Sequence, residues 1–153
     1  MPKLDLTSVA VRTGSSYPAP FNKVAAGRTR QRLGDAGGLT QFGVNLLKLA
    51  PGAWSSQRHW HSAEDEFVYV VSGEVVLVTD NGEEVLRAGD CATFPRNTPD
   101  GHHLINRSEA TAVCLEVGTR MQDDVTTYPD IDLLFDPKFG DYTRKDGTPY
   151  IRK

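Results

Sequence analysis

Short apolar segments separated by turn residues run through the middle of the chain. They occupy residues 42–50, 67–71, 75–79, 83–86, 91–94, 102–105 and 112–117. The pair Asn81-Gly82 lies between two of these segments and is a strong hairpin signal, because both residues tolerate positive φ. The sequence shows no long segment with the 3.6-residue period of an amphipathic helix. Closely spaced strands with such turns predict an all-β sandwich or barrel.

The two ends of the chain are more polar than its middle. Residues 1–40 are rich in turn residues and predict an N-terminal arm, whereas residues 121–153 carry widely spaced apolar anchors. We expect this C-terminal tail to wrap the barrel as a mostly irregular extension. With 153 residues the chain is long enough for one domain with a substantial core. The predicted organisation is an arm (1–40), a barrel (41–120) and a packed tail (121–153).

The segment 67–71, Phe-Val-Tyr-Val-Val, is apolar at every position and does not alternate. A strand of this kind is covered on both faces. One cover is the barrel core, and the other is the arm, the tail or a second subunit. The pattern therefore favours a homodimer.

Charge and composition exclude several classes of protein. The chain has 17 basic and 20 acidic residues mixed along its length, which gives a net charge of −3. It presents no basic surface for nucleic acid or anionic lipid. It contains no apolar run of the length that a signal peptide or a membrane span requires, so a cytoplasmic protein is expected. Cys91 and Cys114 lie in separate apolar segments and are predicted to be free, buried cysteines.

All four histidines fall in two short clusters, His59-Trp60-His61 and His102-His103. Imidazole is the commonest metal-binding side chain, and residues two apart on a strand point to the same face. His59 and His61 can therefore bind one ion together. The histidine pattern predicts a metal site.

Two segments around these histidines resemble the two motifs of the cupin superfamily. The first contains Gly52, the His59/His61 pair and a following acidic run, and it ends at Gly73. The second has a glycine, a proline six residues later, and a histidine four residues before an asparagine, which here are Gly89, Pro95, His102 and Asn106. The resemblance implies a single-domain double-stranded β-helix, or jelly-roll barrel. It also implies one divalent ion bound by His59, His61, Glu66 and His102.

The carboxylate ligand has three candidates, Glu64, Asp65 and Glu66. The cupin pattern places six residues between this ligand and the closing glycine, which favours Glu66. Asp65 would need a local bulge. Glu64 is expected to hydrogen-bond a ligand histidine or to face solvent.

His102 and His103 cannot both point inward from a regular strand. His102 shares its face with Asn106, as in the family pattern, so His103 is expected to support a ligand or to contact a second subunit. The turn before His102 is two residues longer than the pattern, and Asn97 takes a position where the family has glycine. Asparagine can do so in a left-handed turn.

An open site of three imidazoles and a carboxylate favours a small metal-dependent enzyme that acts on a small polar metabolite. The ion could be Zn, Mn, Fe, Ni or Cu. Small cupins of this kind include tentative sugar-phosphate isomerases, and that reaction would need a base, for which Glu66 and Glu116 are candidates. A phosphate group would need cations, for which the candidates are Arg58, Lys48, Arg96 and Arg107.

A dioxygenase is the next hypothesis. It would need a dry pocket, and the candidates for its lining are Val68, Val70, Phe94 and Leu104. The non-catalytic alternative is a module that binds a small molecule or acts as a sensor.

Overall fold

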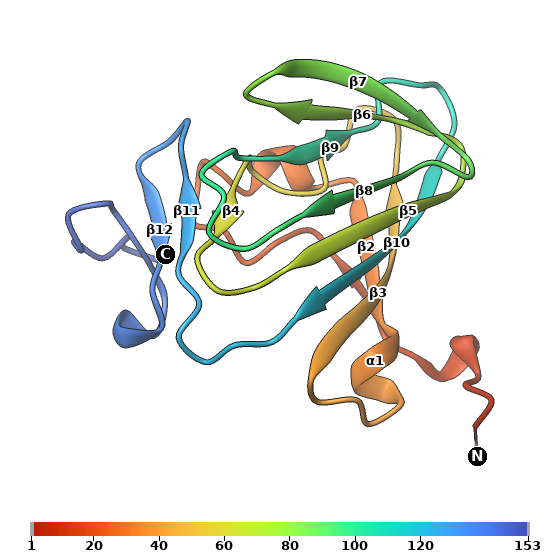
Figure 1. Cartoon of the computed structure of the whole chain (residues 1–153), viewed down its shortest axis with the longest axis horizontal. Helices are drawn as coiled ribbons and strands as arrows, with labels where there is room; N and C mark the ends of the chain where they lie inside the picture. The colour runs from red at the N-terminus through yellow and green to blue at the C-terminus, as the bar shows by residue number, and fades with distance from the viewer. Residues whose placement is uncertain (1, 153) are drawn as a thin grey trace.

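The computed structural model describes residues 2–152 and consists mainly of antiparallel strands in three sheets (Figure 1). The large sheet has the order β1 (Val11–Thr13), β2 (Arg28–Arg32), β3 (Phe42–Leu49), β10 (Ala112–Thr119), β5 (Glu66–Ser72), β8 (Cys91–Phe94). The small sheet is β7 (Gly82–Arg87), β6 (Glu74–Thr79), β9 (His103–Ile105). The third sheet is β13 (Tyr142–Thr143), β12 (Leu133–Phe135), β11 (Thr126–Tyr128), β4 (Trp60–His61). The helical elements are short, namely η1 (Leu6–Ser8), η2 (Lys23–Ala25), α1 (Leu33–Ala36) and η3 (Pro137–Phe139).

The apolar pattern located the barrel strands correctly. Each of the seven apolar segments forms a strand, and these are β3 and β5 to β10. The β6–β7 hairpin closes with Thr79 opposite Gly82, and Gly82 takes a φ of 111° as its turn requires. The prediction of an all-β barrel is confirmed.

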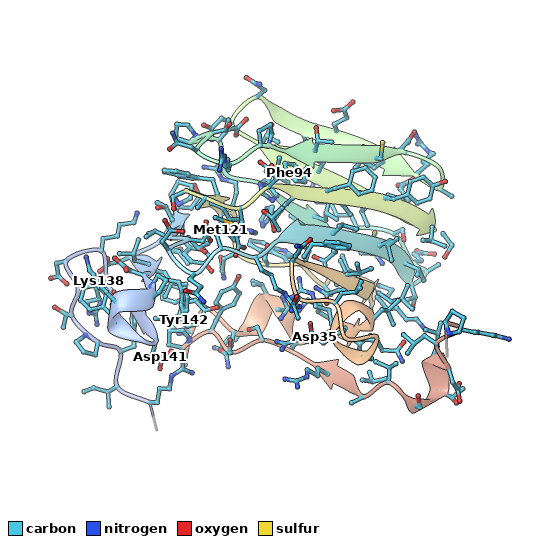
Figure 2. The ribbon with its side chains drawn as sticks, turned by 60° about the horizontal axis from the view of Figure 1, so that its bottom comes forward. Asp35, Phe94, Met121, Lys138, Asp141 and Tyr142 are labelled. Atoms are coloured by element: carbon cyan, nitrogen blue, oxygen red, sulfur yellow. The ribbon has the colours of Figure 1, made fainter. Side chains whose placement is uncertain are left out.

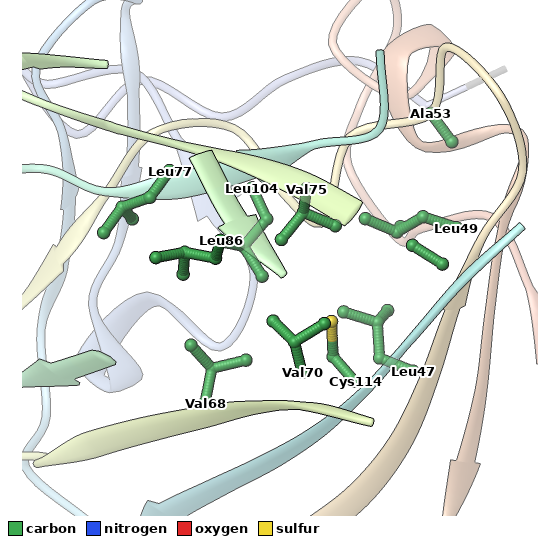
Figure 3. Packing of buried hydrophobic residues seen from close by; sticks show 11 residues of the cluster. Leu47, Leu49, Ala53, Val68, Val70, Val75, Leu77, Leu86, Leu104 and Cys114 are labelled. Carbon is green, nitrogen blue, oxygen red and sulfur yellow. The ribbon is translucent and has the colours of Figure 1, made fainter. Parts of the chain in front are cut away.

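The main core lies between the large and small sheets (Figure 3). Leu47, Val70 and Cys114 from the large sheet meet Val75 and Leu104 from the small sheet. These side chains are at most 4% exposed, so this end of the barrel is closed and apolar. Truncating a buried leucine in such a core costs about 2–5 kcal/mol.

The N-terminal segment has more regular structure than its sequence pattern indicates. β2 pairs with β3 and extends the large sheet, and β1 pairs with β2. The sequence of β2 is Arg-Thr-Arg-Gln-Arg, which has no apolar alternation, so a pattern of hydrophobic residues could not locate this strand. Its three arginine side chains line a polar cavity instead of the core.

The tail contains short strands joined by irregular segments. β11 pairs with β12 and also with β4, which places Thr126 opposite His61. Tyr17 of the arm packs with Tyr128 and Leu133 of the tail in a second apolar cluster. Figure 2 shows Lys138, Asp141 and Tyr142 on the tail at one end of the molecule.

The outward face of β5 is open within residues 2–152. Val68 and Val70 point into the core, whereas Tyr69 and Val71 keep 41% and 49% of their surface exposed. Neither the described part of the N-terminal arm nor that of the C-terminal tail covers these two side chains. A second subunit that covers them therefore remains a prediction. No helix among the described residues is both long and apolar enough to cross a membrane.

The two cysteines are free. Cys114 is buried in the core as predicted, but the prediction of burial is wrong for Cys91. Cys91 begins β8, the edge strand of the large sheet, and is exposed there.

Candidate metal centre

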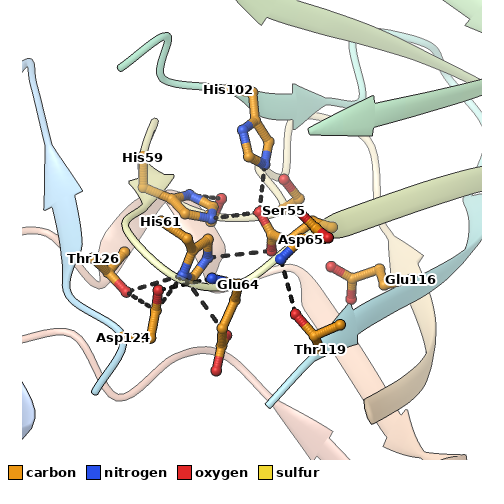
Figure 4. A network of polar contacts seen from close by, with 12 residues as sticks. Ser55, His59, His61, Glu64, Asp65, His102, Glu116, Thr119, Asp124 and Thr126 are labelled. Carbon is orange, nitrogen blue, oxygen red and sulfur yellow. Dashed lines mark hydrogen bonds and ion pairs between the residues drawn. The ribbon is translucent and has the colours of Figure 1, made fainter. Parts of the chain in front are cut away.

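Four side chains from three segments converge at the polar end of the barrel. Figure 4 shows the three histidines among them, His59, His61 and His102. His61 lies in β4, His59 lies just before it, and Glu66 begins β5. His59 and His102 exchange two backbone hydrogen bonds of 3.2 and 2.9 Å in an isolated β-bridge. This bridge fastens the second histidine segment to the first.

The Glu66 carboxylate lies among three imidazole rings. Its Oε2 atom is 2.8 Å from His102 Nε2 and 3.4 Å from His59 Nε2, and its Oε1 atom is 3.4 Å from His61 Nε2. One ligand atom each from His59, His61 and Glu66 fit within 4.8 Å of one another. The structure therefore brings together the four residues for which the sequence predicted metal ligation.

Hydrogen bonds on the far side of two rings orient their Nε2 atoms toward Glu66. His59 Nδ1 donates to Gln57 O at 2.9 Å, and His61 Nδ1 donates to Asp124 Oδ2 at 2.6 Å. When a cation occupies the site, the proton on Nδ1 leaves the Nε2 lone pair of each ring free to bind it. His102 is held differently, because its ring stacks on Phe94 at a centroid distance of 3.5 Å and an interplanar angle of 3°.

The negative charge and the unpaired carboxylate oxygen of Glu66 suit a bound cation. Glu66 Oε2 is buried and has no hydrogen-bond partner among the described residues, which is costly for a carboxylate unless a cation meets it. Burial opposes its ionisation, but the close imidazole groups, His59 first among them, hold the pKa of Glu66 well below its usual value. Burial likewise disfavours protonation of His61, but Asp124 and Glu66 raise its pKa to about 10. The donor set of imidazole nitrogen and carboxylate oxygen suits Zn, Mn, Fe, Ni or Cu.

The competing residues lie in other environments. His103 Nδ1 donates to Ser56 O at 3.0 Å and its ring packs against Trp54, and burial lowers its pKa to about 4. Asp65 Oδ1 accepts the backbone N–H of Arg96 at 2.8 Å.

Glu64 contributes a weak contact to the centre. Its Oε1 accepts the Met121 N–H at 3.0 Å, while its Oε2 is 3.8 Å from His61 Nδ1. Together with His61 and Asp124 it forms a second group with metal-ligand spacing.

Asp124 is the contact that the sequence did not predict. Besides binding His61, its Oδ1 accepts the N–H groups of Ala63 at 2.8 Å and Glu64 at 3.1 Å. It therefore fixes both a histidine and the loop that leads to Glu66. Its position in a polar tail, far from either histidine cluster, offered no spacing that pointed to this role.

Asn97 confirms the prediction of a left-handed turn, with a φ of 54°. Its N–H donates to His61 O at 2.7 Å. The long turn before His102 thus supports the backbone of β4.

The proposed base Glu116 faces the same cavity from β10, where Arg30 holds it. Arg30 Nε and Nη2 donate to its two oxygens at 2.6 and 3.0 Å. Its carboxylate is therefore already engaged in a bidentate ion pair.

Comparison with solved structures places this geometry in a family. A protein from Silicibacter pomeroyi, described as a sugar phosphate isomerase from a cupin superfamily, is 50% identical to this chain. The match covers 98% of this chain and 97% of that one, with a TM-score of 0.91. The chain belongs to the cupin superfamily.

Other matches agree with this membership. Residues 45–118 match the cupin domain family. A protein from Acidithiobacillus ferrooxidans, provisionally described as a sugar phosphate isomerase, is 32% identical over 82% of this chain and 81% of that one, with a TM-score of 0.70. A polyketide cyclase from Streptomyces resistomycificus shares the fold at 22% identity over 78% of this cupin and 79% of that chain, with a TM-score of 0.64. No protein of curated function gives a significant match.

The candidate centre of this cupin lies where two cavities meet. The larger, about 670 Å³, includes His59, Glu66 and His102 in its lining, and the smaller, about 220 Å³, is bounded by His61, Glu66 and His102. Of the residues predicted to line a pocket, Val68, Phe94 and Leu104 face the larger cavity, whereas Val70 lies in the core.

The cations of the larger cavity are not the ones that the sequence suggested. They are Arg28, Arg30, Arg32 and Arg120. Within the described chain, the four predicted candidates are absent from the lining of both cavities, which corrects the assignment of Arg58, Lys48, Arg96 and Arg107. Arg58 is instead largely buried and paired with Asp130 and Asp80, and Arg107 is paired with Glu83 at the surface. The sequence around these two arginines gives no sign of their acidic partners, which lie far away in the chain.

Proposed function

We propose that this cupin is a small metal-dependent enzyme that isomerises a sugar or a sugar phosphate. The proposal assigns one divalent ion to His59, His61, Glu66 and His102. The observation that carries it is the approach of three Nε2 atoms to the half-buried carboxylate of Glu66 at 2.8 to 3.4 Å. The relative at 50% identity, described as a sugar phosphate isomerase, supports the choice of reaction.

The polar cavity suits a hydroxylated substrate. A bound divalent ion supplies Lewis acidity, which polarises a carbonyl or hydroxyl oxygen. Arg30 and Glu116 line the cavity beside the centre and offer guanidinium donors and carboxylate acceptors for substrate hydroxyls. Phe94, stacked on His102, separates this polar space from the smaller cavity. A dioxygenase fits the larger cavity less well, because four arginines face it.

Moving a proton between adjacent substrate carbons requires a base. Glu66 and Glu116 are the proposed groups, and Glu116→Gln separates their roles because it preserves shape but cannot accept a proton. If Glu116 is the base, kcat falls by at least about 100-fold while metal content is unchanged. If kcat is retained, the proton transfer belongs to Glu66.

The first test is elemental analysis of untagged protein purified without chelator. We expect about one divalent ion per chain. The loaded protein is then incubated with aldoses and their phosphates in D₂O, with NMR detection of the ketose and of deuterium incorporation, and with an oxygen electrode in parallel. Interconversion without oxygen uptake supports the proposal, whereas substrate-dependent oxygen uptake replaces it with a dioxygenase. Binding without turnover would favour a sensor module, and protein that takes up no ion would contradict the metal centre.

A further inference from the structure

Arginine side chains form one wall of the larger cavity. Arg28, Arg30 and Arg32 alternate along β2, so their side chains lie on the same face of the sheet, and Arg120 follows β10. Arg28 is committed to the protein, because it donates to the carbonyls of Gly14 and Ser55. Arg30 is engaged by Glu116. Within residues 2–152, the acidic partner of Arg32 and Arg120 is the exposed Asp35.

Arg32 and Arg120 share a single carboxylate at the mouth of the cavity. Arg120 Nη2 donates to Asp35 Oδ1, and Arg32 Nη1 lies 3.9 Å from Asp35 Oδ2. The three side chains are 53%, 41% and 37% exposed for Arg32, Arg120 and Asp35, so solutes can reach them. One carboxylate between two guanidinium groups leaves one positive charge unmatched. The position of Asp35 shows that an oxyanion can be held at this point.

Two glycines on neighbouring strands, Gly43 and Gly118, lie between this arginine pair and the candidate centre. The register places Gly118 opposite Glu66 on one side and opposite Gly43 on the other. Both glycines line the cavity, and a Cβ atom added to Gly43 would lie 3.5 Å from Arg120 Nη2. Two strand spacings separate Gly43 from Glu66, about 10 Å in all. That separation is close to the distance from the carbonyl oxygen to the phosphorus of an extended pentose or hexose phosphate.

We propose that Arg32 and Arg120 form a subsite for the phosphate monoester of the substrate, and that Asp35 occupies it when substrate is absent. The inference rests on the proposed function, since the other end of the substrate would lie at Glu66 and the histidines. A phosphate dianion matches two guanidinium groups in charge, whereas a carboxylate matches only one. Guanidinium groups also bind phosphate oxygens in bidentate fashion, which makes arginine well suited to this role.

The test follows arginine side-chain Nε signals by ¹⁵N NMR while inorganic phosphate is added. The titration is made on the protein as purified and again after metal removal, because phosphate also binds metal ions. We expect saturable shifts of Arg32 and Arg120 in both samples and no shift of Arg107, which is paired with Glu83 on the surface. Acetate is expected to bind more weakly. Shifts at other arginines alone would overturn the proposal.

Substitutions at the proposed subsite test which residues bind the phosphate. The double variant Arg32→Gln/Arg120→Gln is expected to lower phosphate affinity by at least about tenfold. Asp35→Asn is expected to raise it, because the competing carboxylate is removed, and a gain in affinity cannot result from misfolding. Arg107→Gln is the matched control and should bind phosphate like the wild type. Unchanged affinity in the double variant, or no gain in Asp35→Asn, contradicts the subsite.

Metal content separates this proposal from the one on which it rests. Elemental analysis is made on every variant, and the arginine variants are expected to keep their ion. Loss of phosphate binding from a protein with a full complement of metal concerns the subsite alone. A wild-type protein that binds phosphate at Arg32 and Arg120 but takes up no metal would contradict the proposed function and leave the anion site standing.

Discussion

The Nδ1 atom of His61 lies 2.6 Å from the Oδ2 atom of Asp124, and this hydrogen bond joins the C-terminal tail to the histidine pair of the barrel. A carboxylate in this position fixes the ring tautomer and makes the other nitrogen a better metal ligand. The tail of this cupin is therefore part of the candidate centre.

Replacing Asp124 tests this relationship. Asp124→Asn is expected to weaken metal binding by about 10- to 100-fold, because the amide cannot supply the same charge to His61. A competition titration against a chelator of known affinity measures the change. Asp123→Asn, at the exposed neighbouring position, is the control and should bind metal normally. Equal affinities in the two variants would show that the hydrogen bond only supports the fold.

The adjacent histidines His102 and His103 should behave differently when removed. His102→Ala and His61→Ala are expected to lose most of the bound metal, since both Nε2 atoms face Glu66. His103→Ala should keep its metal but unfold more easily by about 1–3 kcal/mol, because its buried hydrogen bond to Ser56 and its contact with Trp54 are lost. Metal analysis and urea denaturation measure the two effects. A metal-free His103 variant beside a metal-replete His102 variant would reverse the assignment.

The two cysteines should differ in reactivity. Cys91 is exposed, whereas Cys114 lies in the core and burial raises its pKa to about 12. Since the thiolate is the reactive form, iodoacetamide at pH 8 should modify Cys91 alone in the folded protein. Mass spectrometry of the peptides identifies the labelled residue, and denatured protein serves as the control in which both react. Rapid labelling of Cys114 in the native state would mean that the core opens readily.

The exposed side of β5 predicts self-association. Tyr69 and Val71 are exposed on a strand that is apolar at both faces, and a homodimer would cover them. Light scattering after gel filtration is expected to give twice the mass of one chain. Val71→Glu should shift the protein to the monomer, while Glu84→Gln on exposed β7 should not. A wild-type monomer at high protein concentration would contradict the interface.

Features that depend on local pattern were predictable from the sequence. The apolar segments located the barrel strands, because each of these strands contributes apolar side chains to the core between the large and small sheets. The two-residue period of a strand predicts that His59 and His61 point to the same side. Asn97 was assigned a left-handed turn because asparagine tolerates positive φ, and its φ is 54°.

Features that depend on long-range pairing were not predictable. The arginines of β2 become a cavity wall only because that strand joins the sheet beside β3, although its own residues show no apolar period. Asp124 reaches His61 only because β11 pairs with β4 across a long sequence separation. Neither partner is specified by the residues around it, since many polar segments have the same composition.

The pairing of β4 with β11 joins two segments that are far apart in the chain. His61 and Asp124 come from distant points of the chain, and Thr126 must lie opposite His61 before the ring is fixed. A chain cut before β11 would therefore keep every strand of the barrel and still lack the carboxylate that orients the His61 ring.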